Sequence, residues 1–115
     1  MKAVSKYKPL KHYTWGNECD GWSLVDEETF SIKQERMPAG TSEAKHYHQQ
    51  AQQFFFILNG TASFEIDNSI IKVNSGEGFH VKAGTIHNIS NKETKDLEFI
   101  LYSQPSTNND RINCE

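Results

Sequence analysis

Residues 40–60 read GTSEAKHYHQQAQQFFFILNG, and residues 76–91 read GEGFHVKAGTIHNISN. The first segment places His46 and His48 two positions apart, so on a β-strand both side chains point to the same face. In the second, His87 follows a glycine turn that could return a strand toward the pair. Transition metals favour imidazole nitrogen, and catalytic metal sites usually combine three protein ligands with an open position. The two segments therefore predict a metal site in a small β-barrel.

The spacing in these segments resembles the two motifs of the cupin superfamily. The first family motif, G-x5-H-x-H-x3,4-E-x6-G, matches residues 40–60, with Gln53 at the position where the family usually has glutamate. The second motif, G-x5-P-x-G-x2-H-x3-N, matches residues 76–91, with Lys82 in place of proline. Many fixed positions at fixed spacing make this resemblance far more specific than a lone H-x-H. Residues 15–22 and 34–40 also resemble the corresponding stretches of small single-domain bacterial cupins.

The resemblance implies an all-β fold, a single jelly-roll barrel or double-stranded β-helix over residues 1–115. The segment after Gln104-Pro105 is expected to form a short, loosely held tail from about residue 105. The resemblance also implies one divalent transition metal ion per chain, and the sequence does not distinguish zinc, nickel, iron, manganese and copper. The implied metal ligands are His46, His48, Gln53 and His87.

Each implied ligand has a plainer interpretation. His46 and His48 could be surface histidines on either side of Tyr47, and only the second motif favours the metal interpretation. Gln53 could be a hydrogen-bonding residue at a strand end, because an amide is a weak oxygen donor to metals. His12 and His80 lie outside the motifs and are interpreted as structural.

An amide at position 53 has an electrostatic consequence. Three neutral imidazoles and an amide leave the full double positive charge on the metal, which strengthens attraction to a carboxylate or enolate oxygen of a ligand. The non-haem iron triad of two histidines and one carboxylate is not offered at this position. This counts against an ordinary oxygenase without excluding a three-histidine iron enzyme.

The rest of the chain is typical of an all-β protein. Short stretches rich in β-formers alternate with turn signals, of which Asn59-Gly60 is the strongest hairpin signal. No helical periodicity of useful length is present. A jelly roll of six to eight strands is expected, with β segments at 23–25, 30–37, 45–48, 53–58, 61–66, 70–73, 79–81, 83–85, 87–90 and 97–103.

Strand alternation also predicts what surrounds the metal. Phe55 and Ile57 share the face of Gln53, while Ile89 and Asn91 share the face of His87. These four residues are predicted to line a pocket with a polar metal centre and apolar walls.

The opposite face of the 53–58 segment carries Phe54, Phe56 and Leu58. Three large apolar side chains on an outer face predict a covered surface, and a homodimer is the expected arrangement.

Composition narrows the partners. A net charge of -3 with scattered charges and no basic patch argues against nucleic acid. No apolar run is long enough to cross a bilayer, and the amino terminus lacks the apolar core of a signal peptide, so a cytoplasmic protein is expected. Cys19 and Cys114 are then expected to be free thiols.

The expected partner is a small molecule, and two functions from different classes lead. The first is a metal-dependent enzyme (isomerase, cyclase, dioxygenase or lyase) acting on a small polar or aromatic metabolite. The second is a non-catalytic barrel that binds or senses a sugar or carboxylate. A structural barrel with a vestigial site fits the intact histidine triad less well. Only Glu35 or Glu98 could serve as a general base, and the sequence does not decide whether Glu35 or Arg36 faces the pocket. Catalytic residues are therefore unassigned.

Overall fold

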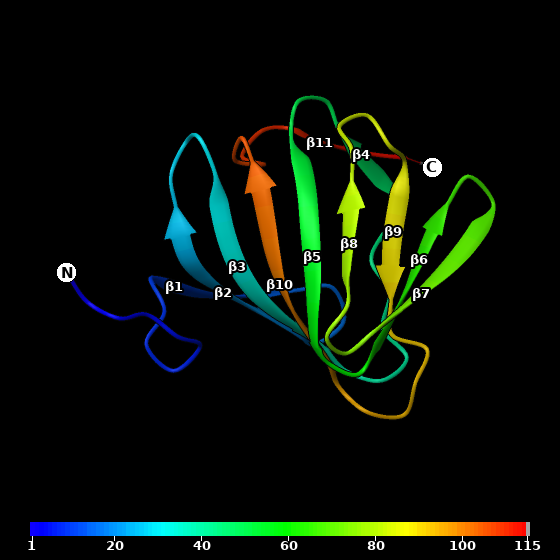
Figure 1. The fold of residues 1–115 in the computed structure, drawn as a ribbon, viewed down its shortest axis with the longest axis horizontal. Coiled ribbons are helices and arrows are strands. Elements are labelled where there is room, and N and C mark those ends of the chain that lie inside the picture. Colours follow the sequence, from blue (N-terminus) through cyan, green and yellow to red (C-terminus); the bar gives the residue numbers. More distant parts are fainter. Residues whose placement is uncertain (115) are drawn as a thin grey trace.

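The computed structural model describes residues 1–114, which form two antiparallel β-sheets without a helix (Figure 1). The larger sheet has the order β1-β2-β3-β10-β5-β8. Its strands are Lys11–Trp15 (β1), Cys19–Asp26 (β2), Ser31–Met37 (β3), Leu97–Gln104 (β10), Gln52–Asn59 (β5) and Gly78–Val81 (β8). The smaller sheet has the order β11-β4-β9-β6-β7. Its strands are Arg111–Asn113 (β11), His46–His48 (β4), His87–Ser90 (β9), Thr61–Ile66 (β6) and Ser69–Asn74 (β7). The expected all-β fold is confirmed.

The core lies between the two sheets. Phe55 of β5 packs edge-on against Phe64 of β6, with ring centroids 4.9 Å apart, and it also contacts Phe99 of β10. All three side chains are buried because strand alternation directs them to the inner faces. These aromatic rings form part of an apolar core between the sheets.

The strand β5 alternates as its sequence predicts. Gln53, Phe55 and Ile57 are buried, whereas Phe54 and Phe56 are 42% and 39% exposed on the outer face. Gly78 of the neighbouring strand β8 pairs with Phe56, and a Cβ at this glycine would lie 2.2 Å from Cζ of Phe54. The glycine therefore makes room for an aromatic side chain on the outside of the sheet.

Eleven strands form in residues 1–114, more than the expected six to eight. The sequence analysis did not anticipate β1 or β11, and residues 83–85 form a turn rather than a β segment. β1 is mostly exposed and lacks apolar alternation, so only its backbone pairing with β2 reveals it.

A loosely held tail was expected from about residue 105, and the structure places residues 111–113 of this segment in a strand. The strand β11 pairs with β4, which places Arg111 opposite His48 and Asn113 opposite His46. Just before it, the carboxylate of Asp110 accepts backbone N–H bonds of 2.9–3.2 Å from residues 49–51. The tail is thus fastened to the loop that joins the histidine strand to β5.

Two smaller expectations can be compared with the structure. Cys19 and Cys114 are both free thiols, and Cys19 lies in the core. In the part of the chain that is described, no helix is present that could span a membrane.

Candidate metal centre

The smaller sheet brings the three motif histidines together. His46 and His48 lie on β4, and His46 pairs directly with His87 of β9. The ring centroids are 5.0 Å apart for His46 and His48, 4.5 Å for His46 and His87, and 6.3 Å for His48 and His87. All three side chains are buried, so the imidazoles form one cluster inside the barrel.

Hydrogen bonds to backbone carbonyls orient two of these rings. Nδ1 of His46 lies 2.9 Å from the carbonyl oxygen of Ala44, and Nδ1 of His87 lies 2.8 Å from that of Thr85. Since a carbonyl only accepts hydrogen bonds, each Nδ1 carries the proton and each Nε2 keeps its lone pair. Metal-binding histidines are commonly oriented in this way.

The cluster also holds buried polar atoms without partners. Nε2 of His87 and Nδ1 of His48 have no hydrogen-bond partner among residues 1–114. Such atoms are rare in folded proteins because burial without a partner costs free energy. A metal ion bound by His87 would satisfy its Nε2, so the residues fit the metal that the sequence motifs imply.

Gln53 is buried beside the histidines on the facing strand β5. Its Nε2 donates a hydrogen bond of 3.1 Å to the Ser103 hydroxyl, while its Oε1 has no partner within the described chain. The amide therefore both hydrogen-bonds through nitrogen and presents a free oxygen. This arrangement fits the ligand interpretation as well as the plainer one.

Burial also sets the protonation of the imidazoles. It lowers the pKa of His46 to about 3 and that of His48 to about 4, and it lowers the pKa of His87 as well. The neighbouring imidazoles and the Arg111 cation add to the effect for His46. At neutral pH the rings are therefore uncharged, which is the form that binds metals.

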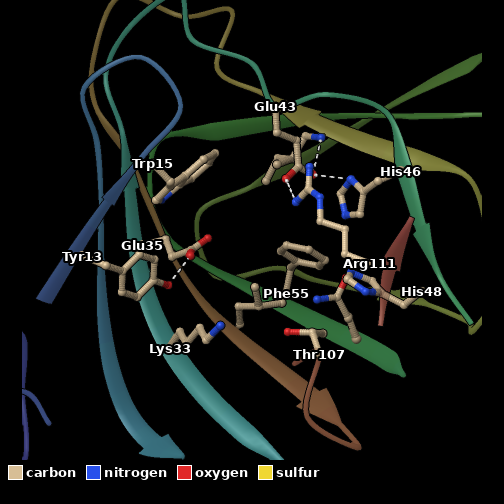
Figure 2. A pocket seen from close by; sticks show the side chains of 13 residues that line it. Tyr13, Trp15, Lys33, Glu35, Glu43, His46, His48, Phe55, Thr107 and Arg111 are labelled. Carbon is tan, nitrogen blue, oxygen red and sulfur yellow. Dashed lines mark hydrogen bonds and ion pairs between the residues drawn. The ribbon is translucent and has the colours of Figure 1, made fainter. Parts of the chain in front are cut away.

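His46, His48 and Gln53 open onto a cavity of about 240 Å³ between the two sheets (Figure 2). The residues that line it are Tyr13, Trp15, Lys33, Glu35, Glu43, His46, His48, Gln53, Phe55, Ile89, Leu101, Thr107 and Arg111. Trp15 both packs against the core and borders the cavity.

Phe55 and Ile89 border the cavity, but the other two residues expected there lie elsewhere. Ile57 is fully buried in the apolar core, further along β5. Asn91 lies just beyond the end of β9, and its amide donates hydrogen bonds to the carbonyl oxygens of Met37 (2.9 Å) and Lys95 (2.8 Å). Its role in the structure is to tie two loops together.

A second polar group faces the histidines across the cavity. Figure 2 shows Glu35 and Tyr13 on one side and His46 and His48 on the other. The Tyr13 hydroxyl donates a hydrogen bond to Oε2 of Glu35. Burial raises the pKa of Glu35, and the bond from Tyr13 opposes this in part. Burial and the Glu35 charge raise the pKa of Tyr13, so the tyrosine stays protonated as a donor.

A glycine allows this pair to form. Gly21 of β2 lies between Tyr13 of β1 and Glu35 of β3 in the strand register. A Cβ at Gly21 would lie 2.0 Å from Cζ of Tyr13, so any side chain there would block the ring.

The structure also decides which member of the Glu35-Arg36 pair faces inward. Arg36 is bound by Asp20 at 2.7 Å and by Asp96 at 3.1 Å, away from the cavity.

Glu43 and Arg111 also line the cavity, and neither was predicted from the sequence. Oε2 of Glu43 lies 3.7 Å from Nη1 of Arg111, and its Oε1 accepts a 3.2 Å hydrogen bond from the backbone of Ile89. Burial raises the pKa of Glu43 to about 8, an effect that Arg111 opposes. Potential ligand atoms of Glu43, His46 and His87 all lie within 4.8 Å of one another.

A partial signal existed for Glu43 and none for Arg111. Glu43 lies three residues before His46, inside the variable part of the first motif, where its acidic side chain could have been considered. Arg111 reaches the cavity only because β11 pairs with β4, and no sequence pattern predicts this pairing.

The fold and the inward histidines define a double-stranded β-helix with a candidate metal centre. A family model described as "Cupin domain" matches residues 33–102, well over half of the sequence, and the chain belongs to this family.

Curated relatives match part of their length. The chain is 36% identical over 55 residues to the uncharacterized HTH-type transcriptional regulator YdeC of Bacillus subtilis, covering 48% of this chain and 19% of that protein. It is 28% identical over 65 residues to the oxalate-binding protein of Thermotoga maritima, covering 56% of this chain and 54% of that protein. The chain thus spans less than two thirds of the length of these relatives.

Solved structures extend the similarity over nearly the whole chain. The polyketide cyclase RemF of Streptomyces resistomycificus superposes with a TM-score of 0.84 at 16% identity, covering all of this chain and 86% of that one. A predicted oxalate decarboxylase of Thermotoga maritima superposes with a TM-score of 0.80 at 18% identity, covering 91% of this chain and 100% of that one. At such identity the likeness shows the fold alone.

Proposed function

We propose that this cupin is a metal-dependent enzyme that moves a proton on a small carbonyl compound carrying a carboxylate. One observation carries the proposal: the Glu35–Tyr13 pair faces His46 and His48 across a single cavity. A metal-ligand cluster and a separate proton-carrying group on opposite walls are the two parts that such a reaction needs.

His46, His48 and His87 would hold the metal, and Oε1 of Gln53, which has no hydrogen-bond partner in residues 1–114, would be available to join them. When bound, a divalent ion supplies Lewis acidity that stabilises negative charge on a carbonyl oxygen. The other steps belong to the protein. Phe55 and Ile89 provide apolar walls beside the cluster, which limit the water that reaches the reacting carbon.

Glu35 is the proposed general base. Its carboxylate would take a proton from the carbon next to the carbonyl group and return it to another atom of the substrate, as in isomerisation or ring closure. The raised pKa of this buried group makes it a stronger base than an exposed glutamate. The Tyr13 hydroxyl holds the carboxylate in place and stabilises its ionised form.

Two cationic side chains support an anionic substrate. Lys33 and Arg111 both border the cavity, and Nζ of Lys33 lies 5.6 Å from the centre of the Tyr13 ring. A guanidinium and an ammonium that border the same cavity attract a carboxylate. The cavity of about 240 Å³ is smaller than most drug-sized sites, which limits the substrate to a small metabolite.

A second candidate function is binding without catalysis. The relatives named as an oxalate-binding protein and as a transcriptional regulator favour it, because neither name describes a reaction. The same cavity would then hold a small carboxylate against the metal, and Glu35 would serve only as a hydrogen-bonding group.

Deuterium exchange distinguishes the two functions. The metal-loaded protein is incubated in D2O with a panel of small 2-oxo acids. Proton NMR follows the loss of signal from the hydrogens on the carbon next to the carbonyl group. We expect catalysed exchange with at least one acid, and none after metal removal. Saturable binding of these acids by calorimetry without any exchange would contradict catalysis and support the binding function.

We also propose that the protein is a homodimer. The outer face of β5 exposes Phe54, Phe56 and Leu58, an apolar surface that a second copy could cover. Light scattering at micromolar concentration should give twice the chain mass of 13.2 kDa. A Phe54→Ser/Phe56→Ser variant should shift toward the single-chain mass. A monomeric parent would contradict this proposal without affecting the metal centre.

A further inference from the structure

We propose that Glu43 supplies a carboxylate ligand to the metal centre, which otherwise has only neutral donors. This inference rests on the metal centre proposed above. It concerns a residue outside the four positions that the sequence motifs indicate, and it changes both the charge and the ligand set of the site.

The side chains of Glu43, His46 and His87 lie close together. Potential ligand atoms of Glu43, His46 and His87 lie within 4.8 Å of one another, and Oε1 of Glu43 lies 3.8 Å from Nδ1 of His46. Nε2 of the buried His87 has no partner among the described residues, so it is available to such an ion. His48 is not part of this tight group, because its ring centre lies 6.3 Å from that of His87.

Hydrogen bonds to the backbone of Ile89 hold Glu43 beside the histidine strand β9. Its backbone N–H donates to the carbonyl oxygen of Ile89 at 3.1 Å, and its Oε1 accepts from the Ile89 N–H at 3.2 Å. The adjacent Ser42 hydroxyl lies 2.8 Å from that of Ser90. The carboxylate is therefore held beside β9 rather than turned toward solvent.

The protein compensates the charge of the Glu43 carboxylate poorly. The Glu43 side chain is only 12% exposed, and its ion-pair partner Arg111 is 3.7 Å away, beyond hydrogen-bond distance. Arg111 is itself 40% exposed and directs its Nε to Asn113 at 2.8 Å. A buried carboxylate with one distant cation is poorly compensated, whereas a divalent ion on the nearby imidazoles would compensate it directly.

The chemical consequence is a different class of site. With Glu43 bound, a carboxylate would join the imidazoles, a mixture of donors that is typical of non-haem iron centres and also suits manganese. Binding of Glu43 would reduce the net charge of the centre from plus two to plus one. It would also release Arg111 from its ion pair, which leaves the guanidinium free for the carboxylate of a substrate.

Metal affinity provides the test. The dissociation constant for zinc is measured by chelator competition, and the visible spectrum of the cobalt form reports the ligand set. We expect Glu43→Gln to weaken zinc binding at least about 30-fold, since even residues that only support a ligand typically cost 10- to 100-fold. The cobalt spectrum should change as well. Glu43→Asp keeps the charge on a shorter side chain and should lose less zinc affinity than Glu43→Gln. This variant provides the test if Glu43→Gln folds poorly.

Two controls separate ligation from a general charge effect. Glu35→Gln removes a carboxylate from the same cavity but outside the Glu43 group, and it should change the dissociation constant less than about 3-fold. In the double variant Glu43→Gln/Gln53→Glu, a carboxylate returns at the position where the family motif usually has glutamate, and it should recover most of the lost affinity. Thermal unfolding of the metal-free forms checks that each variant is folded.

The outcomes are distinguishable. If the parent binds zinc and Glu43→Gln binds it equally tightly with an unchanged cobalt spectrum, Glu43 is not a ligand and the metal centre stands without it. If Glu35→Gln weakens binding as much as Glu43→Gln, the loss is a charge effect and the inference fails. If the parent binds no divalent ion, the metal centre itself is refuted, and this inference with it.

Discussion

Replacing any one of His46, His48 and His87 by alanine is expected to remove most of the bound metal, a loss of about 100-fold or more in affinity. Each imidazole contributes a nitrogen to the same buried cluster, and Nδ1 of His48 and Nε2 of His87 have no other partner in residues 1–114. With one imidazole removed, fewer protein donors hold the ion, so it should bind less tightly.

His12→Ala and His80→Ala are the matched controls and should leave about one ion per chain. Nε2 of His12 lies 2.9 Å from an Asp20 oxygen, and Nε2 of His80 lies 2.9 Å from the side-chain oxygen of Gln52. Both contacts are exposed and outside the cavity. Elemental analysis of the reloaded proteins gives the stoichiometry. Equal metal content in the parent and all three cluster variants would place the site elsewhere.

Glu35→Gln is expected to slow the metal-dependent deuterium exchange by about 100- to 10,000-fold, the usual contribution of a positioned general base. The amide has nearly the same shape as the carboxyl group but cannot accept the proton. Metal content should remain at the parent level, because Glu35 lies across the cavity from the histidines. NMR exchange rates and elemental analysis on the same samples separate these effects.

Glu98→Gln and Tyr13→Phe complete this test. Glu98 was the other carboxylate considered from the sequence, but it is bound by Lys6 at 3.0 Å and Gln34 at 2.9 Å. Its variant should exchange at the parent rate. Removal of the Tyr13 hydroxyl takes away a bond that lowers the pKa of Glu35, so that pKa should rise. Because the base must be ionised, the exchange rate should then reach its plateau at a higher pH. An unchanged rate in Glu35→Gln would remove the base from the proposal.

Local pattern was enough to predict the fold class and the clustering of the histidines. Strand alternation predicted correctly that Phe55 points inward and Phe54 outward, since period two holds along an uninterrupted strand. It failed for Asn91, because β9 ends at Ser90 and alternation does not continue into a loop. It also could not place Ile57 deeper than the cavity, since alternation gives the face of a residue but not its depth.

Other features of the site depend on pairing between distant strands. The inward direction of Glu35 depends on the register of β3 against β2, which contains an irregularity between Ser23 and Val25. Arg111 enters the cavity only through the pairing of β11 with β4. Glu43 reaches the histidines through backbone bonds to β9, 46 residues away in sequence. These contacts join segments far apart in the chain, so residue spacing alone does not predict them.

Anomalous X-ray diffraction from zinc-loaded crystals of the parent tests the metal centre most directly. The account predicts one strong peak per chain, inside the barrel and in contact with nitrogens of His46, His48 and His87. Data collected on both sides of the zinc absorption edge identify the ion. A peak bound by other residues, or no peak at full zinc loading, would contradict the account.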